Sequence, residues 1–268
     1  MTLHKLPAQK VRPGFPARLG ESKLASPPVR PALAHALASD KGHPGLMPHG
    51  LGMDSIAVRQ SMVRKLAQQG ITDPLVLKAM GHIERHRFVD SALVNQAYED
   101  TSLPIGLEQT ISKPGVVARM LELLRQGQSG SMGRVLEIGT GCGYQAAVLS
   151  QLCTEVYSIE RLRGLHDKAR DNLRHFRLAN LHLLLGDGML GYAKGAPYAG
   201  IIAAAGGEAI PAAWLEQLAI GGRLVAPVSA AASSPARQAL VVVDKTIHGL
   251  KQTVMEAVHF VPLKSGVA

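Results

Sequence analysis

The chain has 268 residues, with 29 lysines and arginines against 20 aspartates and glutamates, so its formal net charge is +9. Apolar residues make up 46% and charged residues 18%, a balance that is typical of a folded globular protein and excludes a wholly disordered one. No uninterrupted apolar run approaches the ~18 residues of a membrane-spanning helix, and the N-terminus lacks the apolar segment of a secretory signal. We therefore expect a soluble protein.

The first 52 residues differ in composition from the rest. They hold seven basic and two acidic residues, a net charge of +5, which leaves +4 for residues 53–268. They also hold eight of the 16 prolines, and no helical period persists in them. This composition predicts a flexible extension, with an organelle transit peptide as the alternative. Because aromatic residues are only 4% of the chain and the remaining domain is only mildly basic, we expect no nucleic-acid partner.

Three helices are predicted in an N-terminal helical part, residues 53–130, of a domain that spans residues 53–268. The first covers residues 54–70, with Ile56 on its apolar face. The second begins after Asp73, which is a favourable N-cap because a proline follows it in the first turn. The third runs over residues 114–124.

Residues 131–268 alternate between short apolar segments and helical patterns. The predicted parallel strands cover residues 135–138, 156–159, 181–185, 201–204 and 224–227. Helical patterns lie between them at residues 145–152, 162–176 and 211–218. Repeated βαβ units predict an α/β fold with a doubly wound, mostly parallel, Rossmann-like sheet covered by helices on both faces. Two last segments, residues 239–245 and 254–263, are predicted to form an antiparallel pair at the sheet edge.

The strongest local signal lies where the first of these strands ends. Glu137 is followed by a loop with Gly139, Gly141 and Gly143, and a helix begins directly after the loop. Glycines are needed there because the backbone turns sharply and a ligand approaches closely at the carboxyl end of a strand. A dinucleotide fingerprint requires a third small residue where this chain has Tyr144. The observed pattern, an acid followed by GxGxG, favours a ligand with a cationic amino acid portion, such as S-adenosylmethionine.

Two further acidic residues follow the next two strands. Glu160 ends the second strand, 21 positions after Gly139, where a carboxylate can accept hydrogen bonds from ribose hydroxyls. Asp187 precedes Gly188 after the third strand, where it would contact the adenine amino group. Each acid alone has a simpler explanation, a solvated strand end or a turn. Together Glu137, Glu160 and Asp187 lie at the ends of three successive strands, and this arrangement favours a cofactor site. Thr140 and Gly188, which are near these acids in the loops, are assigned to the same site.

Several motifs outside the glycine loop occur in a characteristic order. Leu103-Pro-Ile-Gly106 and Gln109-Thr-Ile-Ser-Lys-Pro114 precede the glycine loop, Ala97-Tyr-Glu-Asp100 lies before them, and Val258-His-Phe-Val-Pro-Leu263 ends the domain. With these motifs, the sequence resembles the protein-L-isoaspartate (D-aspartate) O-methyltransferase family over about residues 54–263. The glycine loop indicates only the superfamily of class I S-adenosylmethionine-dependent methyltransferases, whereas the second of these motifs is far more specific to the family.

The resemblance implies an enzyme that transfers a methyl group from S-adenosyl-L-methionine to the free α-carboxylate of L-isoaspartyl and D-aspartyl residues, leaving S-adenosyl-L-homocysteine. The ester then closes to a succinimide, which hydrolyses partly to normal aspartate, so a damaged protein is repaired. A carboxylate with an ordinary pKa of ~3.9 is ionised at neutral pH and mainly needs to be held in line with the methyl group. Ser112 matches the serine to which the family assigns the catalytic role, here positioning of the substrate carboxylate. From its position alone, without the resemblance, Ser112 is better explained as an N-cap of the following helix, and the two roles are compatible because a helix N-terminus binds carboxylates.

The sequence departs from the family at several positions and leaves other functions open. Glu108 stands where glycine is common, Ala199 replaces an aspartate, and Glu84-Arg85-His86 replaces a common Pro-Arg-Glu. The main alternative is a methyltransferase that acts on a nucleic acid or a small molecule, although residues 203–211 lack the (N/D/S)-P-P-(Y/F) motif of nucleic-acid enzymes. A non-catalytic binding scaffold is another alternative.

No metal site is predicted from the sequence. His82 and His86 have the spacing of a zinc pair on one helix face, but Glu84 is wrongly placed for HExxH and no third ligand is recognisable. Cys142 and Cys153 form neither a CxxC pair nor a disulfide framework, which favours a reducing, cytoplasmic compartment. Proteins and peptides that contain isoaspartyl residues are the expected partners, with no membrane, and the enzyme is expected to be a monomer.

Overall fold

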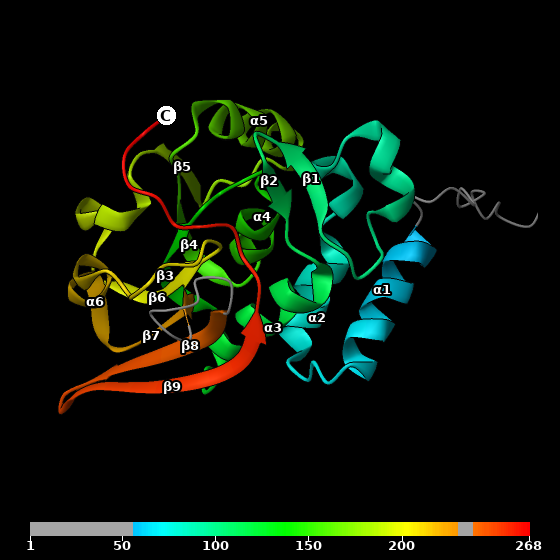
Figure 1. Ribbon diagram of the computed structural model, residues 1–268. Helices are drawn as coiled ribbons and strands as arrows, with labels where there is room; N and C mark the ends of the chain where they lie inside the picture. Colours follow the sequence, from blue (N-terminus) through cyan, green and yellow to red (C-terminus); the bar gives the residue numbers. More distant parts are fainter. Residues whose placement is uncertain (1–55, 230–237) are drawn as a thin grey trace, which may run out of the picture. The chain divides into compact units, whose positions relative to one another are not determined.

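A seven-stranded sheet lies at the centre of the protein, as seen in a computed structural model that describes residues 56–229 and 238–268 (Figure 1). All of these residues belong to one unit, Met47–Ala268. The extension predicted for residues 1–52 lies outside the described residues.

The sheet is parallel except at one edge. The parallel strands lie side by side in the order β5 (Leu181–Leu185), β4 (Cys153–Glu160), β3 (Met132–Ile138), β6 (Tyr198–Ala203) and β7 (Leu218–Ser229). The antiparallel strands β8 (Gln238–Thr246) and β9 (Gly249–Val258) follow β7. The predicted fold class is therefore confirmed.

The predicted position of the last strand, residues 254–263, was wrong. β9 starts at Gly249, because a two-residue turn pairs that residue directly with Thr246. It ends at Val258, and the chain then leaves the ladder because the side chain of Gln238 bonds the backbone of Phe260, accepting from its N–H at 2.8 Å and donating to its carbonyl at 3.3 Å. The motif at residues 258–263 consequently lies beyond the sheet, where it reaches the candidate site.

Successive residues of the central strands point into two separate cores, one on each face of the sheet. On β6, Ile202 belongs to the larger core and Ile201 to the smaller one, and both are fully buried. The larger core is packed by α1 (Ile56–Gln68), α2 (Pro74–His82), α3 (Pro114–Arg125), α4 (Tyr144–Ser150) and α5 (Arg163–Leu173). The smaller core contains Trp214 of α6 (Ala212–Gln217). This alternation is the period of two expected of a sheet that is covered on both faces.

The N-terminal helices follow the prediction with two exceptions. Asp73 caps α2, because its carboxylate accepts hydrogen bonds from Leu75 N (2.8 Å) and Val76 N (3.2 Å). Ile56 is 49% exposed, contrary to the prediction, since it is the first residue of α1 and precedes the turns that hold the buried residues of the helix. His82 and His86 do not share a helix face, because the chain becomes extended and fully buried at Ile83.

After α2 the chain forms short elements that the sequence did not predict. The 3₁₀ turns η1 (Arg85–Phe88) and η2 (Ser91–Gln96) lead to a hairpin of β1 (Leu103–Gly106) and β2 (Gln109–Ile111). Figure 1 shows this hairpin beside α5, and Lys168 Nζ of α5 donates to Ile105 O at 2.9 Å. The hairpin therefore projects toward the carboxyl ends of the parallel strands, where ligands of α/β sheets bind.

Three further 3₁₀ turns connect the later elements: η3 (Arg174–Phe176), η4 (Gly188–Leu190) and η5 (Ala193–Gly195). In the described ranges, none of the helices has the length and apolar character needed to cross a membrane. The same ranges contain no group of three His, Cys, Asp or Glu side chains arranged to hold a metal ion.

Candidate active site

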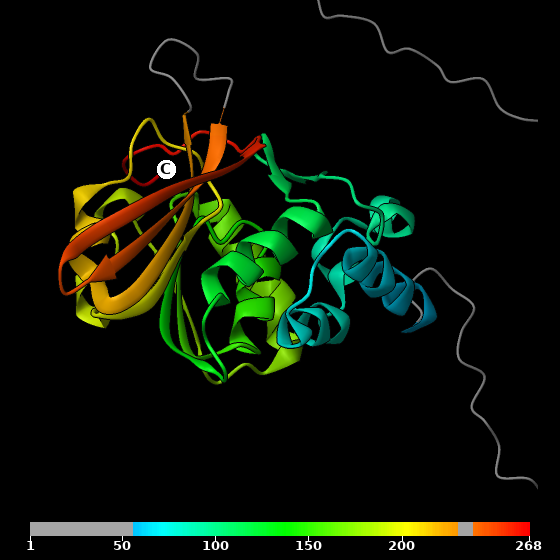
Figure 2. The ribbon, with the colours of Figure 1, turned by 90° about the horizontal axis from the view of Figure 1, so that it is seen from below.

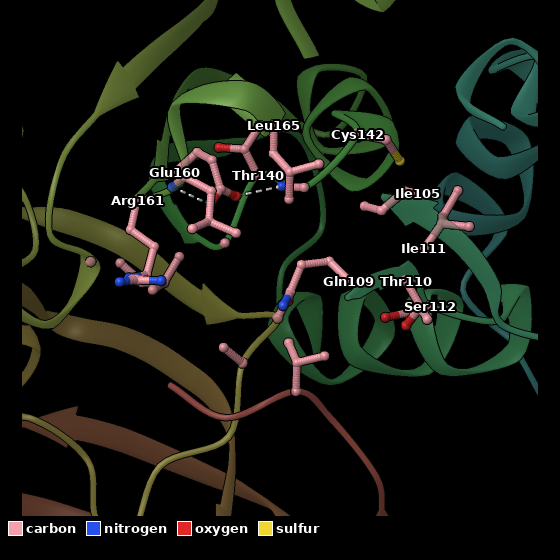
Figure 3. Close-up of a pocket in the computed structure, with 18 of the residues that line it drawn as sticks. Ile105, Gln109, Thr110, Ile111, Ser112, Thr140, Cys142, Glu160, Arg161 and Leu165 are labelled. Carbon is pink, nitrogen blue, oxygen red and sulfur yellow. Dashed lines mark hydrogen bonds between the residues drawn. The ribbon is translucent and has the colours of Figure 1, made fainter. Parts of the chain in front are cut away.

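A cavity of about 470 Å³ lies at the carboxyl ends of β3 and β4 (Figure 3). Its walls come from the glycine loop, the β1–β2 hairpin, the start of α5 and residues 261–264. This volume falls within the range of small-molecule and cofactor sites. Of the predicted site residues, the cavity is lined by Ser112, Gly139, Thr140, Gly141, Glu160 and Gly188. Glu137, Gly143 and Asp187 do not line it.

The glycine loop needs its glycines for backbone conformation and for space. Gly139, Gly141 and Gly143 have φ angles of 89°, 56° and 92°, in the left-handed region that other residues rarely adopt. A Cβ on Gly143 would lie 2.8 Å from Leu173 Cδ1, closer than carbon atoms can approach. Gly143 therefore brings α4 against α5, whereas Gly139 and Gly141 leave backbone exposed to the cavity.

Glu160 extends from the end of β4 toward the glycine loop. Its Oε2 accepts a hydrogen bond from Gly141 N (2.9 Å), and its Oε1 accepts one from Leu162 N (2.9 Å), as Figure 3 shows. The residue is only 5% exposed, but it lines the cavity. These two bonds hold the carboxylate in one orientation and leave each oxygen with capacity to accept a ligand hydroxyl.

Glu137 is fully buried beneath the glycine loop. Ser158 Oγ donates to its Oε2, and Thr140 Oγ1 lies 2.6 Å from the same serine oxygen. Its Oε1 has no hydrogen-bond partner among the described residues. Burial raises the pKa of Glu137 to about 8, although the nearby side chains of Ser158 and Gln145 act in the opposite direction. A buried carboxylate with one free oxygen is prepared to accept a cationic or hydrogen-bonding group.

Asp187 is occupied by the protein itself. Its carboxylate accepts hydrogen bonds from Met189 N (2.9 Å) and from Gly266 N in the C-terminal segment (2.7 Å). Gly188 follows directly and lines the cavity, and its carbonyl accepts a hydrogen bond from Trp214 Nε1 at 2.8 Å. A contact of Asp187 with adenine stays a prediction.

Ser112 lies where the cofactor-sized cavity meets a second cavity of about 850 Å³. The second cavity is bounded by α3 and by the chain that follows β9. Four residues line both cavities: Thr110, Ser112, Ala204 and Val261. The site therefore has two adjoining compartments, and Ser112 belongs to the wall that they share.

The structure separates Ser112 from the role of a helix cap. The N-cap of α3 is Lys113, and the helix N–H of Gly115 is instead bonded by Asp100 Oδ1 at 2.7 Å. Within residues 56–229 and 238–268, Ser112 forms a hydrogen bond through its backbone carbonyl, and none through its hydroxyl. The serine is therefore available to a ligand.

Sequence reasoning assigned no role to several residues that line the first cavity. Leu107 and Glu108 form the hairpin tip, Arg161 follows Glu160, and Lys264 follows the 258–263 motif. Two of these residues could have been found from the sequence: Glu108 departs from the family pattern, and Lys264 directly follows the 258–263 motif. Arg161 gave no such signal, because a single arginine after a strand resembles a solvated charge.

Comparison with known proteins agrees with this geometry. The sequence matches the family model described as protein-L-isoaspartate(D-aspartate) O-methyltransferase (PCMT) over residues 57–268. A protein-L-isoaspartate O-methyltransferase of Methylibium petroleiphilum is 55% identical over 266 residues, covering 96% of this chain and 98% of that protein. One of Leptothrix cholodnii is 54% identical over 252 residues, covering 93% and 88%.

Solved structures show the same fold. A protein-L-isoaspartate O-methyltransferase with 29% identity superposes with a TM-score of 0.70, covering 78% of this chain and 67% of that one. A Plasmodium falciparum protein solved with S-adenosyl-L-homocysteine has 21% identity and a TM-score of 0.67, covering 77% and 98%, and supports the fold alone. The match over residues 57–268 and the two relatives above 50% identity show that the chain belongs to the protein-L-isoaspartate(D-aspartate) O-methyltransferase family.

Proposed function

We propose that this protein transfers a methyl group from S-adenosyl-L-methionine to the free α-carboxylate of L-isoaspartyl and D-aspartyl residues in damaged proteins. The methyl ester closes to a succinimide with loss of methanol, and hydrolysis of the succinimide returns part of the material to normal aspartate. Family membership supports the reaction, and the two-compartment site supports the assignment of residues to it.

The residues around the first cavity fit S-adenosylmethionine. The free, buried Oε1 of Glu137 suits the ammonium of its amino acid portion, directly or through a water molecule, and a nearby cation would lower the raised pKa of this acid. Gly139 and Gly141 let the ligand approach the backbone of the loop, and the Glu160 carboxylate accepts hydrogen bonds from the ribose. Gly188 lines the part of the cavity that would hold the adenine, beside Asp187, whose oxygens are bonded to Met189 N and Gly266 N. When bound, the cofactor supplies a methyl group activated by a positively charged sulfur.

The position of Ser112 between the two cavities is the observation on which the residue assignment rests. A substrate carboxylate in the second cavity meets the first cavity at this hydroxyl, which donates a hydrogen bond and fixes the carboxylate beside the methyl group. Lys113 and Arg119 line the second cavity and supply positive charge there, although Asp100 lies 3.8 Å from Lys113 Nζ and bonds Gly115 N, and Glu256 pairs with Arg119. No general base is required, because the carboxylate is already ionised, so the chain contributes mainly proximity and orientation.

A peptide pair tests the reaction directly. The purified protein is incubated with radiolabelled S-adenosylmethionine and two peptides that differ only in Asp or isoAsp. We expect label only in the isoAsp peptide, released as methanol by mild alkali because it is an ester. Alkali-stable label, or label in added tRNA or DNA, would contradict the proposal.

We also propose that residues 53–268 suffice for catalysis, and that the protein acts as a cytoplasmic monomer without nucleic acid. Both cysteines are free and buried, and burial raises the pKa of Cys142 to about 11 and of Cys153 to about 12, so neither is a reactive thiol. Deleting residues 1–50 should leave the turnover of the isoAsp peptide unchanged. A collapse in turnover of a folded protein, or a dimer mass in light scattering, would contradict these proposals.

A further inference from the structure

A fully buried guanidinium lies behind Ser112, outside the lining of both cavities. Arg85, the first residue of η1, has 0% exposure, and its Nη1 has no hydrogen-bond partner among the described residues. Within those ranges it forms no salt bridge. Burial lowers the pKa of Arg85, against smaller opposing contributions from Tyr144 and Cys142. Burying a charge without an ion pair is costly, so the individual contacts that Arg85 makes determine what it contributes to the fold.

Arg85 joins three segments that meet at the site. Its Nε donates to Ala97 O after η2 (2.8 Å), and its Nη2 donates to Ser112 O (2.8 Å). Its guanidinium carbon lies 4.8 Å from the ring centre of Tyr144, the first residue of α4. Tyr144 lines the first cavity and directly follows the glycine loop. One side chain thus ties the carbonyl of Ser112 to the helix that begins after the glycine loop.

The bond to Ser112 O matters because regular structure leaves this residue between elements. β2 ends at Ile111, α3 begins at Pro114, and the N-cap is Lys113. The Nη2 hydrogen bond restrains the peptide plane that follows Ser112, and with it the position of the Cα from which the Ser112 side chain extends. The planar guanidinium can hold two carbonyls in fixed directions, which a lysine ammonium cannot do with the same geometry.

We propose that Arg85 is a positioning residue for the methyl transfer, which holds Ser112 so that its hydroxyl meets the isoaspartyl carboxylate at the junction of the two cavities. This inference rests on the proposed function of Ser112. A purely structural role would instead lower the stability of the whole protein and leave the kinetic constants of the folded fraction unchanged.

The chain offers a matched control in Arg125. This arginine is also buried (2% exposed), and it bonds Asp73 Oδ2 (2.9 Å) and Gly130 O (2.9 Å), but it bonds neither Ser112 nor the glycine loop. Arg125→Met removes a buried guanidinium of the same size. We expect it to lower the melting temperature while the kcat of the folded protein stays within about twofold of wild type, because no positioned group moves.

Arg85→Met and Arg85→Lys are measured in the full-length protein with the isoAsp peptide. We expect kcat to fall roughly 100-fold in Arg85→Met, and less in Arg85→Lys, because a misplacement of about 1 Å is sufficient for such a loss. The Kd of S-adenosylhomocysteine, measured by calorimetry, should rise far less than kcat falls, since Arg85 does not itself line the cofactor compartment and touches its wall through Tyr144. A folded Arg85→Lys protein with wild-type kcat, or an equal loss of cofactor affinity, would overturn the proposal.

A double variant separates action through Ser112 from a general effect. If Arg85 acts through the serine, Arg85→Lys added to Ser112→Ala should cause no further loss of kcat, because the positioned group is already absent. If kcat of the double variant fell by the product of the two single-variant factors, the proposal would be overturned. Failure of the proposed function is distinguishable, since wild-type protein would then fail to label the isoAsp peptide at all.

Discussion

Glu160 and Ser112 lie on opposite sides of the same cavity, but the chain holds them by different means (Figure 3). Glu160 ends a strand of the parallel sheet. Its two carboxylate oxygens are held by backbone N–H groups, one from Gly141 in the glycine loop and one from Leu162 before α5. Ser112 lies in a short connection between a hairpin and a helix, and a buried arginine holds its carbonyl. The cofactor side is built from regular structure, whereas the substrate side depends on single side-chain contacts.

This difference gives the two sides different tolerance to change. On the cofactor side, β4 is hydrogen-bonded to a neighbouring strand on each edge. A substitution at its end therefore removes a contact with the ligand without moving the backbone. On the substrate side, η1, η2 and the hairpin run outside the large sheet (Figure 2). We therefore expect substitutions there to change catalysis through small displacements, and substitutions at strand ends to change cofactor affinity.

The largest expected effect is that of Ser112→Ala. Removing the hydroxyl should lower kcat for the isoAsp peptide roughly 100-fold, because the carboxylate loses its positioned donor. The free energy of unfolding should change by less than about 0.5 kcal/mol, since the hydroxyl makes no hydrogen bond to another described residue. Ser91→Ala, at an exposed serine of η2, serves as the control and should leave both quantities unchanged. Wild-type turnover by folded Ser112→Ala protein would remove the serine from the mechanism.

Glu160→Ala tests the cofactor side in the same way. Loss of hydrogen bonds to a charged acceptor costs about 1.5–3 kcal/mol, so the Kd of S-adenosylhomocysteine should rise roughly 10- to 100-fold. The KM for the peptide should change little, because Glu160 does not line the second cavity. Glu155→Ala, on the same strand but outside both cavities, is the control. A peptide-specific defect in Glu160→Ala would contradict the division of the site into two sides.

The sequence predicted the cofactor side far better than the substrate side. The predicted bounds of β5 agree with the structure, and the glycine loop and strand-end acids were visible because hydrophobic periodicity and glycine spacing are local properties. The hairpin was missed because its strands have four and three residues and its turn, Leu107-Glu108, lacks the usual Asn-Gly. The burial of Arg85 and the bond between Asp187 and Gly266 depend on tertiary contacts that no local pattern encodes.

Glu137→Gln should have opposite effects on stability and on binding. Because the native pKa of Glu137 is raised to about 8, the cofactor-free native state retains a proton that the unfolded chain has released, so this group lowers stability as pH rises from 4.5 to 8. Each pKa unit corresponds to about 1.4 kcal/mol, so relative to wild type the variant should gain more than about 1 kcal/mol between pH 5 and pH 8.

Urea unfolding at these two pH values, without cofactor, measures the difference. The same variant should bind S-adenosylhomocysteine more weakly, since the neutral amide lacks the negative charge that strengthens a hydrogen bond with an ammonium. A stability difference that does not grow with pH would show that Glu137 is ionised in the native protein.

The smallest expected effect concerns the strained tip of the hairpin. Leu107 and Glu108 have φ angles of 51° and 58°, and a left-handed conformation costs a residue with a Cβ roughly 1–2 kcal/mol. Glu108→Gly removes this cost but adds unfolded-state entropy of about 0.5–1 kcal/mol, so a net gain of under about 1 kcal/mol is expected, with turnover retained. Glu108→Ala keeps the backbone constraint and should give no gain. If the alanine variant were stabilised equally, the cost would come from the carboxylate and not from the backbone, and the substrate side would be strained by charge and not by its turn.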